Sequence, residues 1–496
     1  MSFPLDRRPV LVGVAQITQK PEDPRLAKSP LELMEQAIRD AAQDAGAPKL
    51  VGALDVVAVP KGLWRHADPG RLLAERLGSP GAKTMLGALS GHIVQVLMDR
   101  ACAAIAEGRA DVVAIVGGES ENSRRHLAQS GVPEPWNDAT GGEPDERVGR
   151  FDYVRMDEEA RAGIVQATSM FALCETSLRR ARGESPAAHR DRLAALQVGM
   201  SRIARENPHA WIREEVDAAR VREPGPGNRM VHYPYTKLMT SNIAVDQAAA
   251  LIVCSEEAAR RFGVPAEKRV YLRAATEMGY GVRLGEREVL HRHPGQVLAA
   301  QRVLELAGIG PGDLDHVDAY SCFPFAVQAG AEALGLGLDP LPSVTGGMTF
   351  FGGPLGSYVV HSKATLFERL RADPGSIGVV GSLGGHYAHF GYGVYSTDPG
   401  DRARPVVADV SDEFAAMPRR ALRPDSLDHA GPATVESYTV EVDHDGPKRL
   451  IVAALTPEGH RLFVRSHDPA LMQAALADEE LGGRSGRVAE GLIELD

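Results

Sequence analysis

The chain has 496 residues, of which 44% are hydrophobic and 24% charged, and its formal net charge is −11. This length exceeds what one compact core accommodates, so we expect two or more domains, and the composition is that of an ordinary globular protein. The negative charge argues against nucleic acid or an anionic membrane surface as a partner, because both favour basic patches.

The N-terminal segment and the cysteines indicate a cytoplasmic protein. The first 16 residues contain no apolar run followed by a small-residue cleavage site, so we expect no signal peptide. No segment stays apolar for long enough to span a bilayer. The cysteines are scattered without zinc-type spacing, and we interpret them as reduced thiols. They are Cys102, Cys174, Cys254 and Cys322.

Two stretches of the chain share one order of predicted elements: an apolar strand, a helix and a second strand. In the first stretch these are residues 10–15, 29–46 and 54–59, and in the second they are residues 270–275, 293–308 and 315–322. Ser29 fits the N-cap position, with Pro30 at the first helical position. The shared order predicts an internal duplication of an α/β unit with largely parallel sheets.

The segment between these stretches has a different composition. It is charged, contains several helical patterns and is broken by a loop-type run at residues 221–237 (VREPGPGNRMVHYPYTK). We expect a large insertion over one end of the core, where binding residues tend to lie. The predicted domains are an N-terminal half at residues 1–120, the inserted cap at 121–240, a C-terminal half at 241–400 and a small β domain at 405–496.

The small β domain follows a linker-type run that contains Pro, Gly and charged residues. Three β-rich runs succeed one another at residues 434–446, 448–459 and 460–468, with turn signals between them. Successive hairpins in a domain of this size predict a small antiparallel barrel or sandwich, and an oligonucleotide-fold barrel is the specific form we expect. It lacks the basic and aromatic surface typical of single-strand binding.

Three blocks of the chain resemble thiolases, and they occur in the order found there. They are residues 103–123 (AAIAEGRADVVAIVGGESENS), 241–263 (SNIAVDQAAALIVCSEEAARRFG) and 344–357 (VTGGMTFFGGPLGS). The resemblance implies a duplicated thiolase fold, with layers in the order α/β/α/β/α, over about the first 400 residues.

Further motifs look like the thiolase-like proteins of type 1, a group often labelled acetyl-CoA acetyltransferases. They are residues 228–242 (NRMVHYPYTKLMTSN), 350–364 (FFGGPLGSYVVHSKA) and 390–396 (FGYGVYS). That group lacks the histidine of the thiolase Gly-His-Pro block and carries an additional C-terminal β-barrel, and both features fit this chain. One departure is that its members often have Lys-His where this chain has His389 and Phe390.

Thiolase chemistry needs a cysteine nucleophile, a second cysteine that moves a proton, and oxyanion holes for the thioester oxygens. The resemblance places the nucleophile at Gly91, or at Ala88 with a different anchor. Gly353 stands for the Gly-His-Pro histidine, Tyr320 for an oxyanion-hole residue, and Ser382 for the acid/base cysteine. Because each of these positions is changed, we expect classical thiolase activity to be lost.

Tyr320 leads the candidate catalytic residues, since its phenol can act as a general acid or base; the alternative is a tyrosine packed at the sheet end. His92, beside the vacant nucleophile position, either donates to a thioester oxygen or caps a helix. His361 is either a base at a helix N-terminus or a satisfied core histidine.

His386 and His389 lie in a glycine-rich loop that faces the same pocket by analogy. Cys322 adjoins Tyr320, and we interpret it as a packed thiol.

Arg229, Tyr235 and Lys237 lie in the inserted segment, where thiolases hold coenzyme A. Basic side chains suit phosphate groups, so we expect these residues to contact coenzyme A; the alternative is a solvated loop with a packed Pro-Tyr pair. No phosphate-cradling loop or dinucleotide fingerprint is present. We therefore expect no ATP or NAD as cofactor, and a coenzyme A thioester as ligand or substrate. We also expect no metal, because the candidate histidines have no His-x-x-x-His pattern on a helix and no carboxylate at ligand spacing.

Two classes of function follow from the resemblance. The first is an acyl-CoA enzyme without Claisen chemistry, such as one that cleaves a carbon–carbon bond of a β-hydroxyacyl-CoA. The second is a non-catalytic acyl-CoA-binding or assembly subunit whose barrel contacts a partner protein. An acyltransferase, as the family label suggests, is a further alternative. Either a monomer or a thiolase-type homodimer fits this interpretation.

Overall fold

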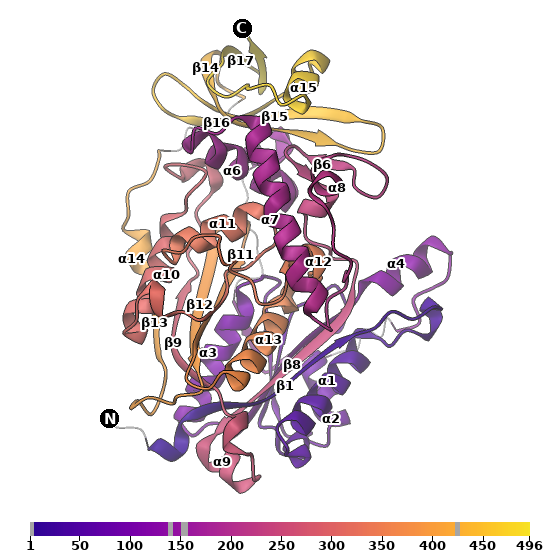
Figure 1. Cartoon of the computed structure of the whole chain (residues 1–496), viewed down its shortest axis with the longest axis vertical. Helices are drawn as coiled ribbons and strands as arrows, with labels where there is room; N and C mark the ends of the chain where they lie inside the picture. The colour runs from indigo at the N-terminus through magenta and orange to yellow at the C-terminus, as the bar shows by residue number, and fades with distance from the viewer. Residues whose placement is uncertain (1–3, 137–141, 150–156, 422–426) are drawn as a thin grey trace.

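The computed structural model describes residues 4–136, 142–149, 157–421 and 427–496 of the chain. Its strands form two sheets of a layered core and a third sheet that includes the C-terminal strands. Figure 1 shows the core below and the C-terminal strands above it, with the inserted region between them. None of the described helices combines the length and the apolar composition that crossing a membrane requires.

The first sheet contains six strands in the order β1-β8-β4-β2-β3-β5. Their bounds are β1 (Pro9–Thr18), β2 (Val56–Pro60), β3 (Lys83–Gly87), β4 (Val112–Ser120), β5 (Glu146–Val148) and β8 (Asp246–Ser255). β8 runs antiparallel to both of its neighbours, whereas β4, β2, β3 and β5 are parallel. Strand β8 follows the inserted region in the chain and falls in the predicted C-terminal half, residues 241–400. It nevertheless belongs to the first sheet.

The second sheet contains five strands in the order β10-β11-β12-β9-β13. Their bounds are β9 (Tyr271–Met278), β10 (His316–Asp318), β11 (Ile377–Gly384), β12 (His389–Ser396) and β13 (Val406–Asp409). The run β9-β12-β11-β10 repeats the run β1-β8-β4-β2 with the same directions of pairing. This repeat confirms the predicted duplication. The sheets are mixed and not largely parallel, because β8 and β12 each run against both neighbours.

Helices cover both sheets and also separate them, which confirms the predicted α/β/α/β/α layers. The outer helices are α1 (Pro30–Asp44) and α2 (Pro69–Arg76) on the first sheet, and α10 (Pro294–Ala307) on the second with α11 (Pro324–Ala333) beside it. The central helices α3 (Ile93–Ala106) and α13 (Tyr358–Ala372) contact both sheets. Nearly all side chains of α3 are buried, as expected for a helix enclosed on every side.

The start of α1 shows how local sequence sets an element boundary. The Ser29 hydroxyl accepts a hydrogen bond from the Glu32 backbone N–H, while the Glu32 carboxylate accepts one from the Ser29 backbone N–H. This reciprocal pair satisfies two N–H groups that the helix itself cannot. Pro30 occupies the first helical position, so the predicted start of this helix is confirmed.

The inserted region is mainly helical, and part of it lies between the core and the C-terminal strands, whereas residues 121–129 lie beside the first sheet (Figure 1). Its elements are α4 (Glu121–Gln129), α5 (Asp157–Ala162), α6 (Ala167–Ala181), α7 (Pro186–Glu206), α8 (Ala218–Arg222), β6 (Met230–His232) and β7 (Tyr235–Thr236). Short helices elsewhere in the chain are α9 (Glu256–Arg261), α12 (Gly347–Phe350) and α14 (Ser411–Ala415). α6 packs against α11 of the core and against the C-terminal strands, so it joins the two parts.

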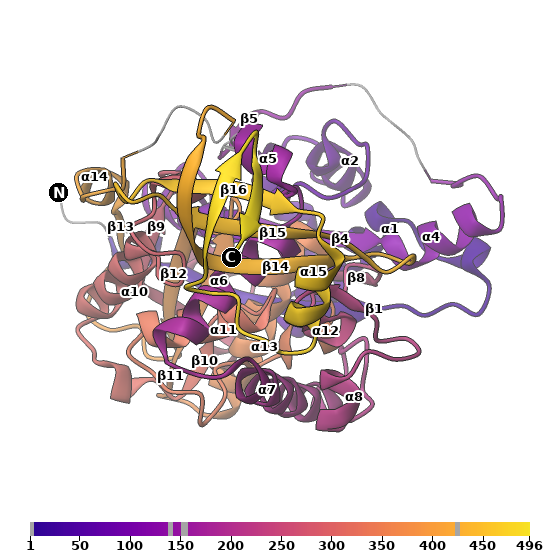
Figure 2. The ribbon, with the colours of Figure 1, turned by 90° about the horizontal axis from the view of Figure 1, so that it is seen from above.

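The C-terminal strands form a closed five-stranded barrel, as predicted. They are β14 (Gly431–Val442), β15 (Pro447–Leu455), β16 (Arg461–Ser466), β17 (Ser485–Ala489) and β18 (Leu492–Leu495). The order β14-β15-β16-β18-β17 closes back on β14, and α15 (Pro469–Leu476) joins the third strand to the fourth. This is an oligonucleotide-fold arrangement, with one parallel pair, β16 and β18, among antiparallel ones. Figure 2 shows the barrel from above, over α6.

Candidate functional site

A cavity of about 480 Å³ lies where the two halves of the core meet the inserted region. Ser90 and Gly91 line it from the turn before α3, and Tyr320 lines it from the turn after β10. Gly353 lines it from the segment after α12, and Gly384 from the end of β11. The structure therefore brings together three positions that the sequence comparison assigned to thiolase catalysis, namely Gly91, Tyr320 and Gly353.

The Tyr320 hydroxyl occupies the space that a side chain at position 91 would need. A Cβ atom at Gly91 would overlap both this hydroxyl oxygen and the Leu383 carbonyl oxygen. Tyr320 itself has a φ of 73°, a left-handed conformation that is strained for a bulky residue and is often associated with functional sites. A cysteine nucleophile at position 91 is thus incompatible with Tyr320 in this position.

The Tyr320 hydroxyl is protonated and is available to a ligand. Burial, followed by the nearby Cys322 and Asp318, raises the pKa of Tyr320 well above its usual value. Within the described part of the chain, no group is hydrogen-bonded to this hydroxyl. At neutral pH it can therefore donate a hydrogen bond to an oxygen that develops negative charge in the cavity.

Serines occur at or beside two of the positions that the resemblance assigned to thiolase catalysis: Ser241 lies beside Gly353, and Ser382 itself occupies the other. A Cβ atom at Gly353 would overlap the Ser241 hydroxyl, which also lines the cavity. Ser382 is buried in β11, and its hydroxyl donates a hydrogen bond to the Gly391 carbonyl at 2.9 Å. The structure thus places Ser382 within the sheet and outside the cavity lining.

A serine–histidine pair lies at the base of the cavity. The Ser90 hydroxyl oxygen is 2.7 Å from His92 Nδ1, and the His92 ring packs against the His389 ring with centroids 4.9 Å apart. Gly384 makes room for the pair, because a Cβ atom there would overlap the Ser90 hydroxyl oxygen. Burial, with a smaller effect of His389, lowers the pKa of His92 to about 3. The His92 ring is therefore neutral and can accept the hydroxyl hydrogen.

The remaining candidate histidines differ in position. His386 lines the cavity from the glycine-rich loop and has a φ of 56°. His389 is buried behind it, next to His92. His361 is fully buried in α13, where its Nδ1 lies 3.0 Å from Gln16 Oε1 and its ring packs against Phe351. The structure does not bring His361 to the cavity.

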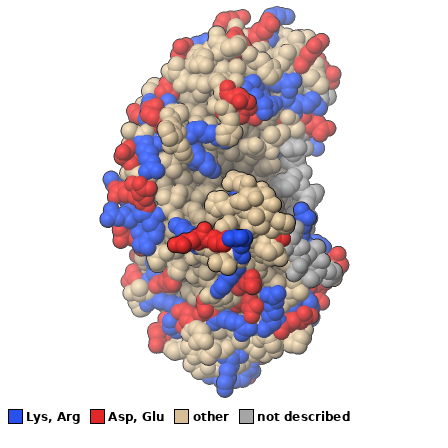
Figure 3. Space-filling model, turned by 90° about the vertical axis from the view of Figure 1, so that its right-hand side faces the viewer, with Lys and Arg blue, Asp and Glu red and all other residues tan. Residues whose placement is uncertain are grey.

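Basic side chains from the inserted region converge on the cavity. Arg125, Arg229 and Lys237 line it, and the Lys237 ammonium has no ion-pair partner among the described residues. Burial, followed by repulsion from Arg125 and Arg229, lowers the pKa of Lys237. On the face shown in Figure 3, basic and acidic side chains are interspersed. The cations that line the cavity suit the phosphates of a nucleotide.

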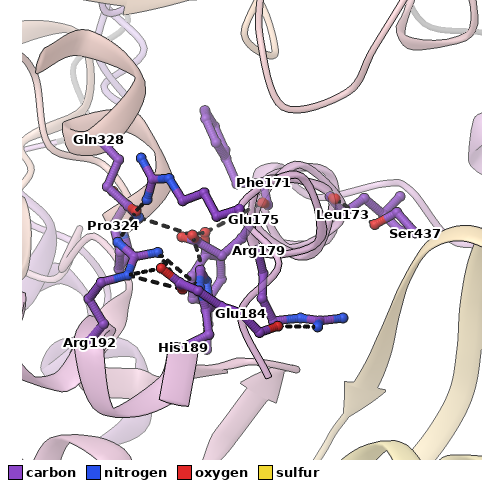
Figure 4. Close-up of polar contacts among 12 residues, drawn as sticks. Phe171, Leu173, Glu175, Arg179, Glu184, His189, Arg192, Pro324, Gln328 and Ser437 are labelled. Atoms are coloured by element: carbon purple, nitrogen blue, oxygen red, sulfur yellow. Dashed lines mark hydrogen bonds and ion pairs between the residues drawn. The ribbon is translucent and has the colours of Figure 1, made fainter. Parts of the chain in front are cut away.

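Tyr235 lies outside the cavity lining and joins a buried polar network around Glu175, which Figure 4 shows with His189 and Gln328. Its hydroxyl donates a hydrogen bond to Glu175 Oε2 at 2.8 Å. The other carboxylate oxygen of Glu175 lies 2.9 Å from His189 Nε2 and accepts from Gln328 Nε2 at 3.0 Å. His189 in turn contacts Glu184. The network joins α6, α7 and α11, so the contacts of Tyr235 are with the scaffold.

The cysteines are free and buried throughout the described chain. Cys322 is the cysteine that lines the cavity, and burial raises its pKa, so it is a neutral thiol. A neutral thiol without a nearby base is a poor nucleophile.

Sequence reasoning missed Ser90, Ser241 and Arg125 as parts of the site. Ser90 precedes the vacant nucleophile position, so the Ser-x-His spacing of residues 90–92 was a usable signal. Ser241 and Arg125 gave none, because their role depends on contacts with segments distant in the chain.

Comparisons with known proteins agree with the fold. A family model described as the thiolase-like protein type 1 additional C-terminal domain matches residues 409–491. A monomeric SCP2-thiolase like protein type 1 from Mycobacterium smegmatis has a crystal structure that covers 100% of both chains, with 30% sequence identity and a TM-score of 0.83.

More distant relatives are named as a thiolase subunit and as an acetyltransferase. The benzoylsuccinyl-CoA thiolase subunit BbsB of Thauera aromatica is 27% identical over 318 residues, which is 57% of this chain and 72% of that protein. An acetyl-CoA acetyltransferase of Methanothermobacter thermautotrophicus is 27% identical over 220 residues, or 40% of this chain and 55% of that protein.

Proposed function

This chain belongs to the thiolase-like protein type 1 family, and we propose that it binds a coenzyme A thioester in the 480 Å³ cavity and acts on the acyl group without thiolase chemistry. The main observation in support is the position of the Tyr320 hydroxyl beside Gly91, where the cavity reaches the turn before the start of α3. That hydroxyl can donate to the thioester oxygen, while Arg229 and Lys237, with Arg125, can hold the phosphates.

Open space and protic groups favour a catalytic role over a passive one. Phe350 and Phe351, which could have filled the pocket, are fully buried and lie outside its lining. The lining instead presents the hydroxyls of Tyr320 and Ser90. Claisen condensation through a thiol is not proposed, because position 91 has no room for a cysteine and the Cys322 thiol is neutral.

The first test is isothermal titration calorimetry with coenzyme A and acetyl-CoA. We expect saturable binding, and a loss of affinity on the order of tenfold or more for the double variant Arg229→Ala/Lys237→Ala, because two phosphate contacts are removed. Arg220→Ala is the matched control, since Arg220 is an exposed arginine of the inserted region that pairs with Glu214. An absence of binding to wild-type protein would overturn the proposal.

Tyr320→Phe tests the role of the hydroxyl. We expect this variant to bind coenzyme A as tightly as wild type and to lose turnover on the order of a hundredfold, because the donor to the developing oxyanion is removed. Full turnover by Tyr320→Phe, measured by mass spectrometry of the products, would contradict this role.

A second candidate is carbon–carbon cleavage of a β-hydroxyacyl-CoA. The observation that favours it is that Tyr320 and His386, two groups able to move protons, line the same cavity. This reaction yields a carbonyl compound and a shorter acyl-CoA without release of free coenzyme A, so mass spectrometry of the products distinguishes it. Binding without any turnover would favour a non-catalytic acyl-CoA-binding or assembly subunit.

A further inference from the structure

The Ser90–His92 pair has the geometry of an activated nucleophile, and neither thiolase chemistry nor the proposed role of Tyr320 uses it. A serine hydroxyl becomes nucleophilic when a neighbouring imidazole accepts its proton, and the oxygen-to-nitrogen distance must then be that of a hydrogen bond. The 2.7 Å between Ser90 Oγ and His92 Nδ1 meets this requirement. Ser90 lines the cavity, whereas His92 is 4% exposed and lies outside the cavity lining.

The surroundings of the pair also fit acyl transfer. Ser90 lies just before α3, which begins at Ile93. The backbone N–H groups of Ile93 and Gln95 donate to the Ser90 and His92 carbonyls, so they are not the donors for a ligand. The Tyr320 hydroxyl lies next to Gly91, the residue between Ser90 and His92. A carbonyl carbon placed at Ser90 therefore has this hydroxyl nearby as a donor for its oxygen. Burial lowers the pKa of His92, so the ring is neutral before the attack and its imidazolium form is only transient during proton transfer.

We propose that Ser90 takes the acyl group from a coenzyme A thioester, with His92 as its general base, so that this protein is an acyl-CoA hydrolase. The inference rests on the proposed function, because it requires the thioester to bind in this cavity.

The steps balance without any further reactant than water. The Ser90 oxygen attacks the thioester carbonyl carbon while its proton passes to His92 Nδ1. The carbon–sulfur bond then breaks, and the imidazolium returns the proton to the leaving thiolate, which gives acyl-Ser90 and free coenzyme A. Water attacks the ester by the same route, with His92 again moving the proton, and releases the carboxylic acid.

The cavity contains a matched control serine. Ser241 lines the same cavity, and its hydroxyl is not hydrogen-bonded to a histidine in the described chain. If cavity exposure alone made a serine reactive, Ser241 would react as well as Ser90. If the histidine is required, Ser90 alone would react.

The experiment uses full-length protein and a fluorophosphonate probe, which modifies activated serines irrespective of the acyl chain. Peptide mapping by mass spectrometry should find the label on Ser90, with labelling lost in Ser90→Ala and kept in Ser241→Ala. His92→Asn keeps a hydrogen-bond acceptor but removes the base, and it should label on the order of a hundredfold more slowly. Release of free thiol from acetyl-CoA and hexanoyl-CoA is measured on the same variants, with circular dichroism to verify folding.

The outcomes separate this inference from the proposed function. Label on Ser90, with slow labelling of a folded His92→Asn variant, supports it. Label elsewhere, no label, or wild-type labelling of His92→Asn overturns it, even when calorimetry shows that coenzyme A binds. A protein that binds no coenzyme A overturns the proposed function, and hydrolysis of its thioesters along with it.

Discussion

At the scale of single residues, the site is defined by which side chains are absent. Gly91 and Gly384 each stand where a Cβ atom would overlap a functional hydroxyl, that of Tyr320 or that of Ser90. Each hydroxyl therefore occupies the space that the missing side chain of its glycine leaves. Replacing Gly91 would displace the Tyr320 hydroxyl, and replacing Gly384 would displace the Ser90 hydroxyl. Glycine at position 91 and Tyr320 beside it therefore form one packing arrangement.

Gly91→Ala tests this complementarity. The added Cβ displaces the Tyr320 hydroxyl, so we expect a loss of about 1–3 kcal/mol in the free energy of unfolding, measured by urea denaturation. The double variant Gly91→Ala/Tyr320→Phe should recover part of the loss, because the overlap with the hydroxyl oxygen is removed, while those with the Leu383 carbonyl oxygen and the ring carbon Cζ of residue 320 remain.

Gly52→Ala is the control for the glycine substitution, since a Cβ atom there meets nothing within 4 Å. It should change stability little. Equal stability of Gly91→Ala and wild type would show that Tyr320 is free to move away from position 91.

At the scale of elements, buried carboxylates hold the inserted helices to the core. Glu175 on α6 is fully buried and contacts Tyr235, His189 on α7 and Gln328 on α11 (Figure 4). A carboxylate in such surroundings is stable only when its oxygens are hydrogen-bonded. The network therefore sets the position of α6, whose first residue lines the cavity.

Glu175→Ala leaves three buried partners without their acceptor, so we expect a loss of about 3–5 kcal/mol in unfolding free energy. Tyr235→Phe removes one hydrogen bond and should cost about 1–2 kcal/mol, with the affinity for coenzyme A unchanged because Tyr235 lies outside the cavity lining. Urea denaturation and calorimetry give the two quantities.

The comparison for this network is Glu214→Ala, which removes an exposed ion pair with Arg220 and should have almost no effect. If Tyr235→Phe binds coenzyme A more weakly than wild type, the prediction from sequence that Tyr235 contacts coenzyme A directly would be supported instead.

At the scale of the whole molecule, the barrel is bound closely to the rest of the chain. Arg461 of β16 is buried, pairs with Glu436 and donates to the backbone carbonyls of Leu284 and Gly285 in the core. The Ser437 hydroxyl of β14 donates to the Leu173 carbonyl of α6 at 2.6 Å. Strand β6 of the inserted region adds to the barrel sheet through β14. The barrel therefore serves as a fixed part of the scaffold.

This attachment predicts one cooperative thermal transition. We expect differential scanning calorimetry of the full chain to show the barrel and the core unfolding together, because each buries surface of the other. Arg461→Ala should lower the temperature of that transition, whereas Arg487→Ala, on the exposed part of β17, should not. A separate early transition of the barrel in wild-type protein would contradict this expectation.

The sequence by itself determined the fold class and the elements that depend on local signals. Periodic apolar residues, the Ser29–Pro30 helix start and the glycine-rich blocks act within a few residues of each other, so they can be interpreted without a structure. They were enough to predict the duplication and the C-terminal barrel, and the resemblance of the glycine-rich blocks to thiolases implied the order of the layers.

Only the tertiary structure decided the contents of the site. The Tyr320 hydroxyl lies beside Gly91, and the charge of Arg125 acts on Lys237. Strand β8 pairs with β1 and β4, which come much earlier in the chain. All of these contacts join segments that are far apart in the sequence. His361 and Tyr235 carry side chains suited to catalysis or binding, yet packing directs them into the scaffold. Residue type sets what a side chain can do, but long-range packing decides whether it reaches the cavity.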